Sequence, residues 1–427
     1  MNVDQAALSA DTLRAVELAA APVPALAELL ERCFPLLPAS VLATDPPRRG
    51  RPNDLMTPAS DRLAAVAGGQ TLFAVASPSP VSVRIDDASP AVMSRVPGSP
   101  YWVHLEALAA GVTHSYEYEV DGLGLGRGDV AGYTPMSCDI GSPAGQLIGP
   151  IEVTSAAFGG AVTRVWLYVC AGVDPSQPSP FMVWLDGQEF LGALDLLGAR
   201  LLWCTDNVVA AGKMPPLVHV LVAPGVGGPE TPRTFDGQSH EEALRSLQFD
   251  VAEALYGEHI VTEVLPAVAS FVTLSDDRAD GAAGGMSSGG AGAFGLGWFH
   301  PGRFSRVYST IGSFVRLRPG GELSAGGDEY ARLVGAEARD LRVWLSTGVG
   351  DINVGAWGRK DLYAAGSWLD GNRSLAQSLE RSGYDHRFVV GTAGHNLAQA
   401  GVELPDALAW LWSDHARGGA GSAQVTD

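Results

Sequence analysis

The sequence predicts a doubly wound, mostly parallel α/β domain that is preceded by a small all-β sandwich. Two observations carry this prediction. From about residue 70 to 150, short segments of alternating apolar and polar residues are separated by Ser, Pro and Gly turns, which is typical of strands in a sandwich. From about residue 151 onward, apolar strand candidates alternate with helical segments, which indicates a parallel sheet covered by helices.

The composition fits a globular protein and excludes several kinds of partner. The 427 residues are 46% hydrophobic and 18% charged. The formal net charge is -19, with 28 Lys and Arg against 47 acids. Because phosphate binding needs clustered positive charge, we expect neither nucleic acid nor an anionic membrane as a partner. No apolar run reaches the roughly 18 residues that a membrane helix needs.

The beginning of the chain and the cysteines indicate a cytoplasmic protein. The first residues carry acids early and show no basic segment followed by an apolar core, so we identify no signal peptide. The cysteines are far apart, with no CxxC pair, and we expect reduced thiols, although a structural disulfide stays open. They are Cys33, Cys138, Cys170 and Cys204.

Residues 1–45 predict two short amphipathic helices, and residues 46–150 predict the sandwich. In "HSYEYEV", Tyr116 and Tyr118 share one face of a strand with Val120, while Glu117 and its polar neighbours share the other. "GLGLGRG", residues 122–128, follows this alternating strand rather than a buried parallel one, so we expect a hairpin loop and no dinucleotide site. The strand candidates of this part are residues 71–77, 81–86, 101–108 and 114–122.

Residues 151–415 predict the α/β domain, and residues 416–427 predict a disordered tail. One long amphipathic helix is expected over residues 246–271. In such sheets, chemistry gathers in the loops that leave the carboxyl ends of the strands. The passages that run from a predicted strand into a loop are residues 163–172, 180–188, 216–225, 304–314, 341–351 and 384–395.

The segment "GMSSG", residues 285–289, fits G-x-S-x-G, the turn that exposes a serine nucleophile. Ser287 is the central residue, and glycines flank it because side chains there would collide in a sharp strand-to-helix turn. The preceding "DGAAGG" has low strand propensity, which leaves a flexible linker as the alternative. Against the linker stands the apolar "AGAFGLGWF" that follows and predicts a helix.

A serine nucleophile needs a base and an acid that orients the base, in the order Ser, acid, His. His395 lies in "GTAGHN", directly after a predicted strand, and is the preferred base. Asp351 follows the predicted strand "LRVWLSTG" in a glycine turn and is the preferred acid. The competing bases are His300, His386 and His415, and the competing acids are Asp361, Asp370 and Asp385. We expect Asp370 to be a helix N-cap or a turn residue and Asp385 to make a surface bond.

An oxyanion hole requires two backbone N–H groups. We expect one from Ser288, directly after the nucleophile, and the other from Gly187 or Gln188 in the loop after "FMVWL". An ordinary β-turn at residues 186–187 is the alternative for that loop. No HExxH or His-x-His cluster is present, so no metal and no cofactor are expected.

The ordered set "FMVWLDGQEF … RSLQFD … GGMSSGGAGAF … GVGDIN … GYDHRFVVGTAGHN … LPDALAWLW" resembles the enterochelin esterase-like branch of the "Putative esterase" (esterase D) α/β-hydrolases, over about residues 150 to 412. More loosely, "FAVASPSPVSVRID" and "YWVHLEALAAGVTHSYEYEVDG" resemble the immunoglobulin-like early-set domain that precedes the hydrolase in that family. The resemblance implies a serine esterase with Ser287, Asp351 and His395 as its triad. It also implies substrate-binding roles for Arg245 and Gln248, where Gln248 replaces an acid of the family pattern.

The sequence therefore predicts a carboxylic-ester hydrolase for a small-molecule ester. The resemblance implies a siderophore trilactone as the substrate, and a feruloyl, acetyl or other aryl or alkyl ester is the alternative. An alternative of another class is a non-catalytic binding or scaffold protein. Tyr101 and Trp102 would be its sugar platform, although we prefer core packing or a domain contact for these two rings. A homodimer stays open.

Overall fold

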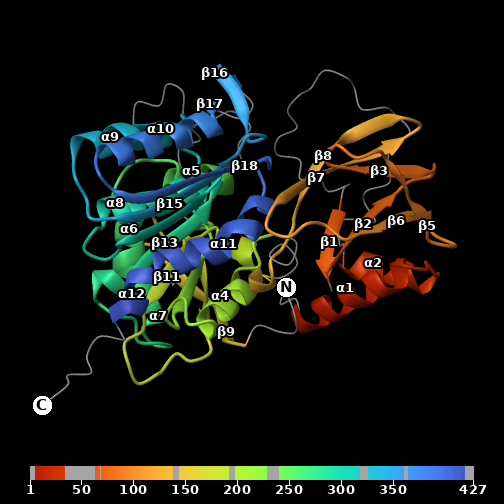
Figure 1. The fold of residues 1–427 in the computed structure, drawn as a ribbon. Coiled ribbons are helices and arrows are strands. Elements are labelled where there is room, and N and C mark those ends of the chain that lie inside the picture. The colour runs from red at the N-terminus through yellow and green to blue at the C-terminus, as the bar shows by residue number, and fades with distance from the viewer. Residues whose placement is uncertain are drawn as a thin grey trace, which may run out of the picture. The chain divides into compact units, whose positions relative to one another are not determined.

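The computed structural model describes residues 5–33, 63–67, 69–137, 144–191, 198–227, 240–317, 326–359 and 364–418. Contacts group the chain into two compact units, each with a core of its own (Figure 1). The first unit holds Met1–Pro143, Leu191–Cys204 and Thr392–Leu404. The second unit holds Ala144–Phe190, Thr205–Gly391 and Pro405–Asp427.

The first unit contains two four-stranded antiparallel sheets with a shared apolar core. One sheet has the order β1 (Leu63–Ala67), β2 (Gln70–Ala76), β6 (Tyr101–Glu106), β5 (Ser94–Arg95). The other has the order β4 (Ala91–Val92), β3 (Val81–Ile85), β7 (Thr113–Val120), β8 (Leu123–Ala131). The core between them includes Phe73, Val75, Val83, Tyr116, Tyr118 and Val130. The predicted strands are therefore present, and they form an all-β unit.

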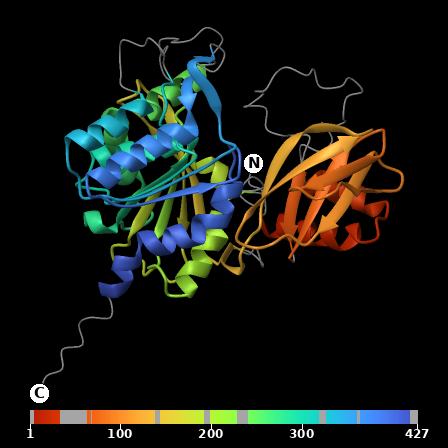
Figure 2. The same ribbon diagram turned by 45° about the horizontal axis from the view of Figure 1, so that its top comes forward.

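Two helices, α1 (Gln5–Ala19) and α2 (Ala25–Cys33), pack on the other face of the β1–β2–β6 sheet, as Figure 2 also shows. Their apolar stripes, with Val16 and Leu30, contact Leu72 and neighbouring strand residues. Successive side chains of β2 point to opposite faces of the sheet, and both sets are buried, one in each core. The Tyr101 ring lies in this core and its hydroxyl donates to Glu31 at 2.8 Å. Core packing, which we preferred to a sugar platform, is therefore confirmed for Tyr101.

The hairpin between β7 and β8 is present, but the predicted seven-residue loop is not. Asp121 and Gly122 form the turn with φ values of 52° and 75°, and β8 begins at Leu123. The glycine-rich run continues as a strand, and its glycines leave room for side chains of the neighbouring strand β7. A Cβ on Gly128 would lie 2.5 Å from the Tyr116 ring.

The second unit is built on an eight-stranded sheet of order β18-β15-β14-β13-β11-β12-β10-β9. The strands from β18 to β12 are parallel to one another, and β10 and β9 are antiparallel at one edge. The predicted, mostly parallel α/β sheet is therefore confirmed. The strands are β9 (Gln146–Thr154), β10 (Val162–Val169), β11 (Phe181–Leu185), β12 (Val218–Val222), β13 (Gly281–Met286), β14 (Arg306–Thr310), β15 (Arg342–Gly348) and β18 (Asp385–Gly391).

Helices lie on both sides of this sheet (Figure 1). On one face, Val343 and Leu345 of β15 share a core with Leu375. On the other face, the Trp344 ring packs 5.9 Å from that of Trp410. Burial on both sides explains why the strands are almost continuously apolar. The helices of the sheet's surroundings are α4 (Leu201–Ala210), α5 (His240–Phe249), α8 (Ser287–Phe299), α9 (Tyr330–Ala336), α10 (Trp368–Arg381), α11 (Ala398–Leu411) and α12 (Ser413–Gly418).

The single long helix predicted over residues 246–271 is wrong. Helix α5 ends at Phe249, and Val251 instead forms a β-bridge with Gly326. A second helical run then passes from α6 (Leu255–His259) through a π-helical turn (Ile260–Val264) into α7 (Leu265–Val268). The apolar periodicity continues across the break because both runs bury residues in the same core, which periodicity alone does not separate.

The glycine-rich β13 is a central, buried strand despite its low strand propensity. A Cβ on Gly284 would lie 2.7 Å from Met182 and 3.0 Å from the Trp184 ring. Its helix α8 is also glycine-rich. A Cβ on Gly292 would lie 2.8 Å from Leu185, and one on Gly297 would lie 2.7 Å from Val307. Close packing between helix and sheet therefore overrides propensity here.

Cys170 and Cys204 are free and buried, and burial raises the pKa of the Cys170 thiol to about 12. The side chains of Cys33 and Cys138 lie outside the described residues. Helix α12 ends at Gly418, and the rest of the predicted tail also lies outside them. Among the described helices, none combines the length and the apolar character that a membrane crossing requires.

Candidate active site

Ser287 lies at the turn from β13 into α8, with a φ of 53°. This left-handed backbone is uncommon for a residue with a side chain and is typical of strained functional turns. The flanking glycines are required by the geometry. A Cβ on Gly285 would collide with the Gly289 carbonyl oxygen, and one on Gly289 would lie 2.9 Å from the Leu185 oxygen. The collision expected for side chains at these two positions is confirmed.

The Ser287 side chain has a hydroxyl neighbour that the sequence did not reveal. The Oγ atoms of Ser287 and Ser313 are 3.4 Å apart, and the Ser313 N–H donates to the Ser287 carbonyl at 3.0 Å. Ser313 is buried in the loop after β14 and also accepts a hydrogen bond from Trp368 Nε1 at 3.1 Å. The available signal was the passage "RVYSTIGS", a strand that ends in small polar residues.

Asp351 lies in the loop after β15, where its carboxylate accepts hydrogen bonds from Thr347 and Ile352. Thr347 Oγ1 donates to Oδ2 at 2.7 Å, and the Ile352 N–H donates to Oδ1 at 2.7 Å. The side chain is buried. The Trp368 N–H donates to the Ile352 carbonyl at 2.9 Å. Trp368 therefore connects the Asp351 loop to Ser313.

The two loops predicted to form the oxyanion hole leave neighbouring parallel strands. Leu185 of β11 pairs with Gly285 of β13, so residues 186–188 and 286–288 follow at the same edge of the sheet. Gly187 begins a 3₁₀ turn, and a Cβ there would collide with the Val222 nitrogen. Ser288 lies in the first turn of α8, where backbone N–H groups have no partner within the helix. The roles of Ser288, Gly187 and Gln188 stay predictions.

The two residues predicted to bind substrate both make contacts within the protein. Arg245 donates to both carboxylate oxygens of Asp186, at 2.9 and 2.6 Å. Gln248 is 2% exposed and accepts a hydrogen bond from the Gly225 N–H at 3.0 Å. Arg245 therefore fixes the residue before Gly187, and a direct substrate contact by either side chain stays a prediction.

Three of the four candidate histidines have contacts far from Ser287 within the second unit. His386 lies near the amino end of β18, with Nδ1 3.1 Å from the Tyr384 oxygen. His415 Nε2 lies 2.9 Å from Asp280, which precedes β13. His300 follows the last residue of α8, with Nε2 3.0 Å from the Ala254 oxygen. Ser287 stands at the opposite end of both β13 and α8.

His395, the preferred base, lies in the loop between β18 and α11, in the first unit. It is half-buried. The residues on either side of it are bound by one carboxylate, that of Asp129: the Gly394 N–H and Asn396 Nδ2 each donate to Oδ2 at 2.8 Å.

The competing acids that the structure describes have other partners. Asp385 pairs with Arg342 at 2.7 Å on the surface, as predicted. The prediction that Asp370 is an N-cap is wrong, because Ser367 caps α10 by accepting from the Asp370 N–H. Asp370 lies in the first turn and pairs with Arg373 at 2.7 Å. Asp361 lies outside the described residues.

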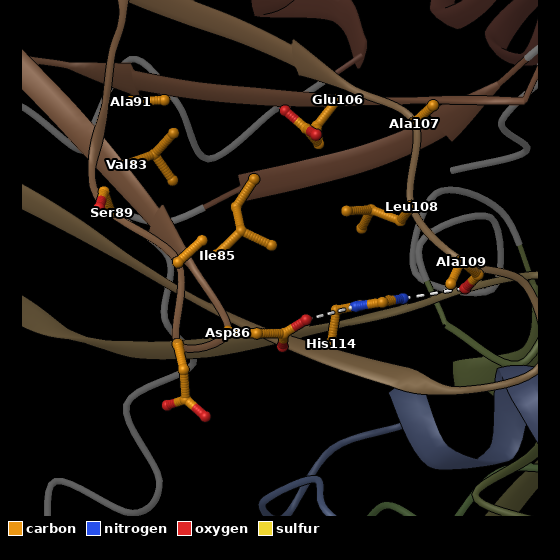
Figure 3. Close-up of a pocket in the computed structure, with 12 residues that line it drawn as sticks. Val83, Ile85, Asp86, Ser89, Ala91, Glu106, Ala107, Leu108, Ala109 and His114 are labelled. Atoms are coloured by element: carbon orange, nitrogen blue, oxygen red, sulfur yellow. Dashed lines mark hydrogen bonds and ion pairs between the residues drawn. The ribbon is translucent and has the colours of Figure 1, made fainter.

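A pocket of about 420 Å³ opens in the first unit and is lined by sandwich residues alone (Figure 3). Among its lining residues, His114 Nδ1 lies 2.7 Å from Asp86 and Nε2 lies 2.9 Å from the Ala109 oxygen. None of the predicted site residues lines this pocket. Within the part of the chain that the structure describes, no group of three or more His, Cys, Asp or Glu could hold a metal ion.

A family model described as "Putative esterase" matches residues 157–411, which is more than half of the chain. The chain belongs to this esterase family. The protein is therefore an ester hydrolase, as its sequence predicted. The match covers β10 through α11 and includes every predicted site residue.

Solved structures of enterochelin esterases are similar to this esterase over most of both chains. The enterochelin esterase of Shigella flexneri has 17% identity and a TM-score of 0.54, covering 83% of this chain and 96% of that one. The ferric enterobactin esterase of Salmonella typhimurium has 19% identity and a TM-score of 0.52, covering 84% and 98%. At these identities the likeness concerns the fold. A search of the curated proteins found no match.

Proposed function

We propose that this esterase is a serine carboxylic-ester hydrolase with Ser287 as its nucleophile. The observation that carries the proposal is the left-handed backbone of Ser287, at the turn between β13 and α8, with glycines that no larger residue could replace on either side. A strained turn of this kind presents a serine hydroxyl above the carboxyl edge of a parallel sheet.

Asp351 and His395 complete the proposed triad. Asp351 follows β15, and its carboxylate is oriented by Thr347 and by the Ile352 N–H. His395 follows β18, and β18 and β15 end together, since Gly348 pairs with Gly391. The other histidines after Ser287 support this choice, because each contacts groups at the amino end of a strand or at the far end of α8.

The proposed reaction is acyl transfer in two steps. Ser287 Oγ attacks the ester carbonyl carbon while His395 takes its proton, and Asp351 stabilises the imidazolium and holds the ring tautomer. The N–H groups of Ser288 and of Gly187 or Gln188 stabilise the oxyanion. The carbon–oxygen bond to the alcohol breaks, and the alcohol leaves with the proton from His395. Water, deprotonated by His395, then attacks the acyl-enzyme and releases the acid and free Ser287.

We propose a siderophore trilactone as the substrate class. The support is the likeness to enterobactin esterases over most of their length. One from Shigella flexneri, solved in the presence of enterobactin, is covered to 96%, with 18% identity and a TM-score of 0.54. A small aryl or alkyl ester is the second candidate, because one triad on this fold serves many esters.

Replacement of the nucleophile tests the proposed function. Ser287→Ala should reduce hydrolysis of p-nitrophenyl butyrate by about 10⁴-fold or more, with unchanged circular dichroism. A fluorophosphonate probe should label Ser287 in the wild type and leave the variant unlabelled. Full activity of Ser287→Ala, or no adduct on Ser287, would contradict the proposal and favour a binding or scaffold protein. A panel of trilactones, feruloyl esters and short acyl esters, ranked by kcat/KM, would decide the substrate class.

A further inference from the structure

The loop that carries His395 is bound to strand β8 of the sandwich. Asp129 Oδ2 accepts hydrogen bonds from the Gly394 N–H and from Asn396 Nδ2, both at 2.8 Å. The Asp129 side chain is only 6% exposed. One carboxylate oxygen therefore binds the residue before His395 and the residue after it.

Arg127 completes this arrangement from the same strand. Residues 127 and 129 are two apart on β8 and share one face of the strand. Arg127 contacts Asp129 Oδ1 at 3.2 Å and donates to the Thr392 carbonyl at 3.1 Å. Asp129 thus uses Oδ2 for the loop and Oδ1 for Arg127, and Arg127 adds a contact at the start of the loop.

The far end of the loop is also fixed. Asn396 Oδ1 accepts from the Ala398 N–H at 3.0 Å, so Asn396 joins Asp129 to the first turn of α11. Within that helix, a Cβ on Gly401 would lie 2.8 Å from the Tyr133 ring and 3.0 Å from Ala131. The helix start therefore packs closely on the segment that ends β8. The loop from Thr392 to Asn396 has contacts with the sandwich along its length.

We propose that Asp129 is a positioning residue for the base of the reaction, with Arg127 as its partner. The inference rests on the proposed function, in which His395 is that base. Hydrogen bonds to an ionised carboxylate are stronger than those to a neutral amide, so they hold the backbone on both sides of His395 in one geometry. A base must be placed this closely because a displacement of about 1 Å can cost roughly 100-fold in rate. The sandwich therefore takes part in catalysis through these two residues.

The test compares kcat per active site in variants of the full chain. Asp129→Asn keeps the shape but removes the charge, and Asp129→Ala removes both. With p-nitrophenyl butyrate, we expect kcat to fall about tenfold in Asp129→Asn and about 100-fold in Asp129→Ala, with KM within threefold of wild type. Arg127→Gln, at a half-exposed position, should lower kcat by about threefold. Active sites are counted by exhaustive fluorophosphonate labelling, so a loss of folded protein does not enter the result.

Asp86→Asn is the matched control. Asp86 is another sandwich carboxylate that accepts a backbone hydrogen bond, from Ser115 at 2.8 Å, but its hydrogen bonds in the described structure are with His114 and Ser115 and not with residues 392–396. The Asp86→Asn variant should have the same kcat per labelled serine as the wild type. The inference is overturned if both Asp129 variants keep wild-type kcat per labelled serine, or if Asp86→Asn loses as much. Failure of the proposed function is distinguishable, because Ser287→Ala or His395→Ala would then remain active.

Discussion

Trp368 Nε1 donates a hydrogen bond to the hydroxyl of Ser313, and that hydroxyl lies 3.4 Å from Ser287 Oγ. The backbone N–H of the same tryptophan donates to Ile352, beside Asp351. One residue at the start of α10 therefore supports the loops of the proposed nucleophile and of the proposed acid. The indole contact constrains Ser313, and through it the neighbourhood of Ser287.

Ser313→Ala should lower kcat about tenfold and leave KM nearly unchanged, because the Ser287 hydroxyl loses a neighbour at 3.4 Å and the indole N–H of Trp368 loses its hydrogen bond to Ser313. Steady-state kinetics with p-nitrophenyl butyrate measures this effect. Ser309→Ala is the control: within the described structure the Ser309 hydroxyl is buried without a hydrogen-bond partner. Equal kinetics for the two variants would contradict a special role for Ser313.

Thr347→Val should lower kcat severalfold and cost about 1 kcal/mol of stability, because Asp351 loses a buried hydroxyl donor at 2.7 Å. Urea unfolding and pH–rate profiles measure the two effects. Thr310→Val is a matched control on the neighbouring strand, since the Thr310 hydroxyl is buried and has no partner among the described residues. We expect Thr310→Val to be neutral or slightly stabilising. If Thr347→Val behaves in the same way, Thr347 does not orient Asp351.

Gly289→Ala should abolish most activity and cost about 1–3 kcal/mol of stability, because the new methyl group would lie 2.9 Å from the Leu185 oxygen and 3.0 Å from Asp186. The strain falls on the first turn of α8, next to Ser288. Gly302→Ala is the control, since nothing lies within 4 Å of a Cβ there. Thermal unfolding and activity assays would disprove the packing argument if both variants resembled wild type.

The stability of the second unit should depend on pH through His219. The ring is fully buried, accepts from Trp184 Nε1 at 2.8 Å and contacts Thr205, and burial lowers its pKa from 6.5 to about 3. The folded state thus favours the neutral ring. The stability that the neutral His219 ring contributes to the folded state is fully present above pH 6.5. It is lost as the pH falls toward 3, at up to about 1.4 kcal/mol per pH unit.

His219→Gln, which keeps an acceptor for Trp184 but does not titrate, should therefore lose less stability than wild type between pH 6.5 and 4. Urea unfolding at several pH values gives the difference between the two proteins. Parallel stability curves would show that His219 does not contribute to the acid dependence.

The proposed site could be named from the sequence because its signals are local. Ser287 is marked by its flanking glycines, and Asp351 and His395 each follow an apolar strand. The contacts that support them are not local. Asp129 is 265 positions from Gly394 in the sequence, and Trp368 is 55 positions from Ser313. No spacing rule connects such residues, because only the folded chain brings them together.

The fold was predictable for the same reason, and the errors have a common cause. Alternation and apolar runs report burial, so the strands predicted from them are present in both units. They do not report which neighbour covers a residue. The strand β13 was undervalued because Met182 and Trp184 fill the space that its own side chains would occupy. The break after Phe249 was missed because both helical runs bury residues in one core.

The close approach of α8 to the sheet has a consequence for how this protein can vary. The Leu185 side chain occupies the volume next to Gly292, and Val307 occupies the volume next to Gly297. The volume next to each glycine is therefore already filled by the side chain of its strand partner. Enlarging the glycine is tolerated only together with a smaller partner, so Gly292→Ala should combine non-additively with Leu185→Ala. A substitution at a glycine of α8 therefore requires a compensating substitution at the strand residue that it contacts.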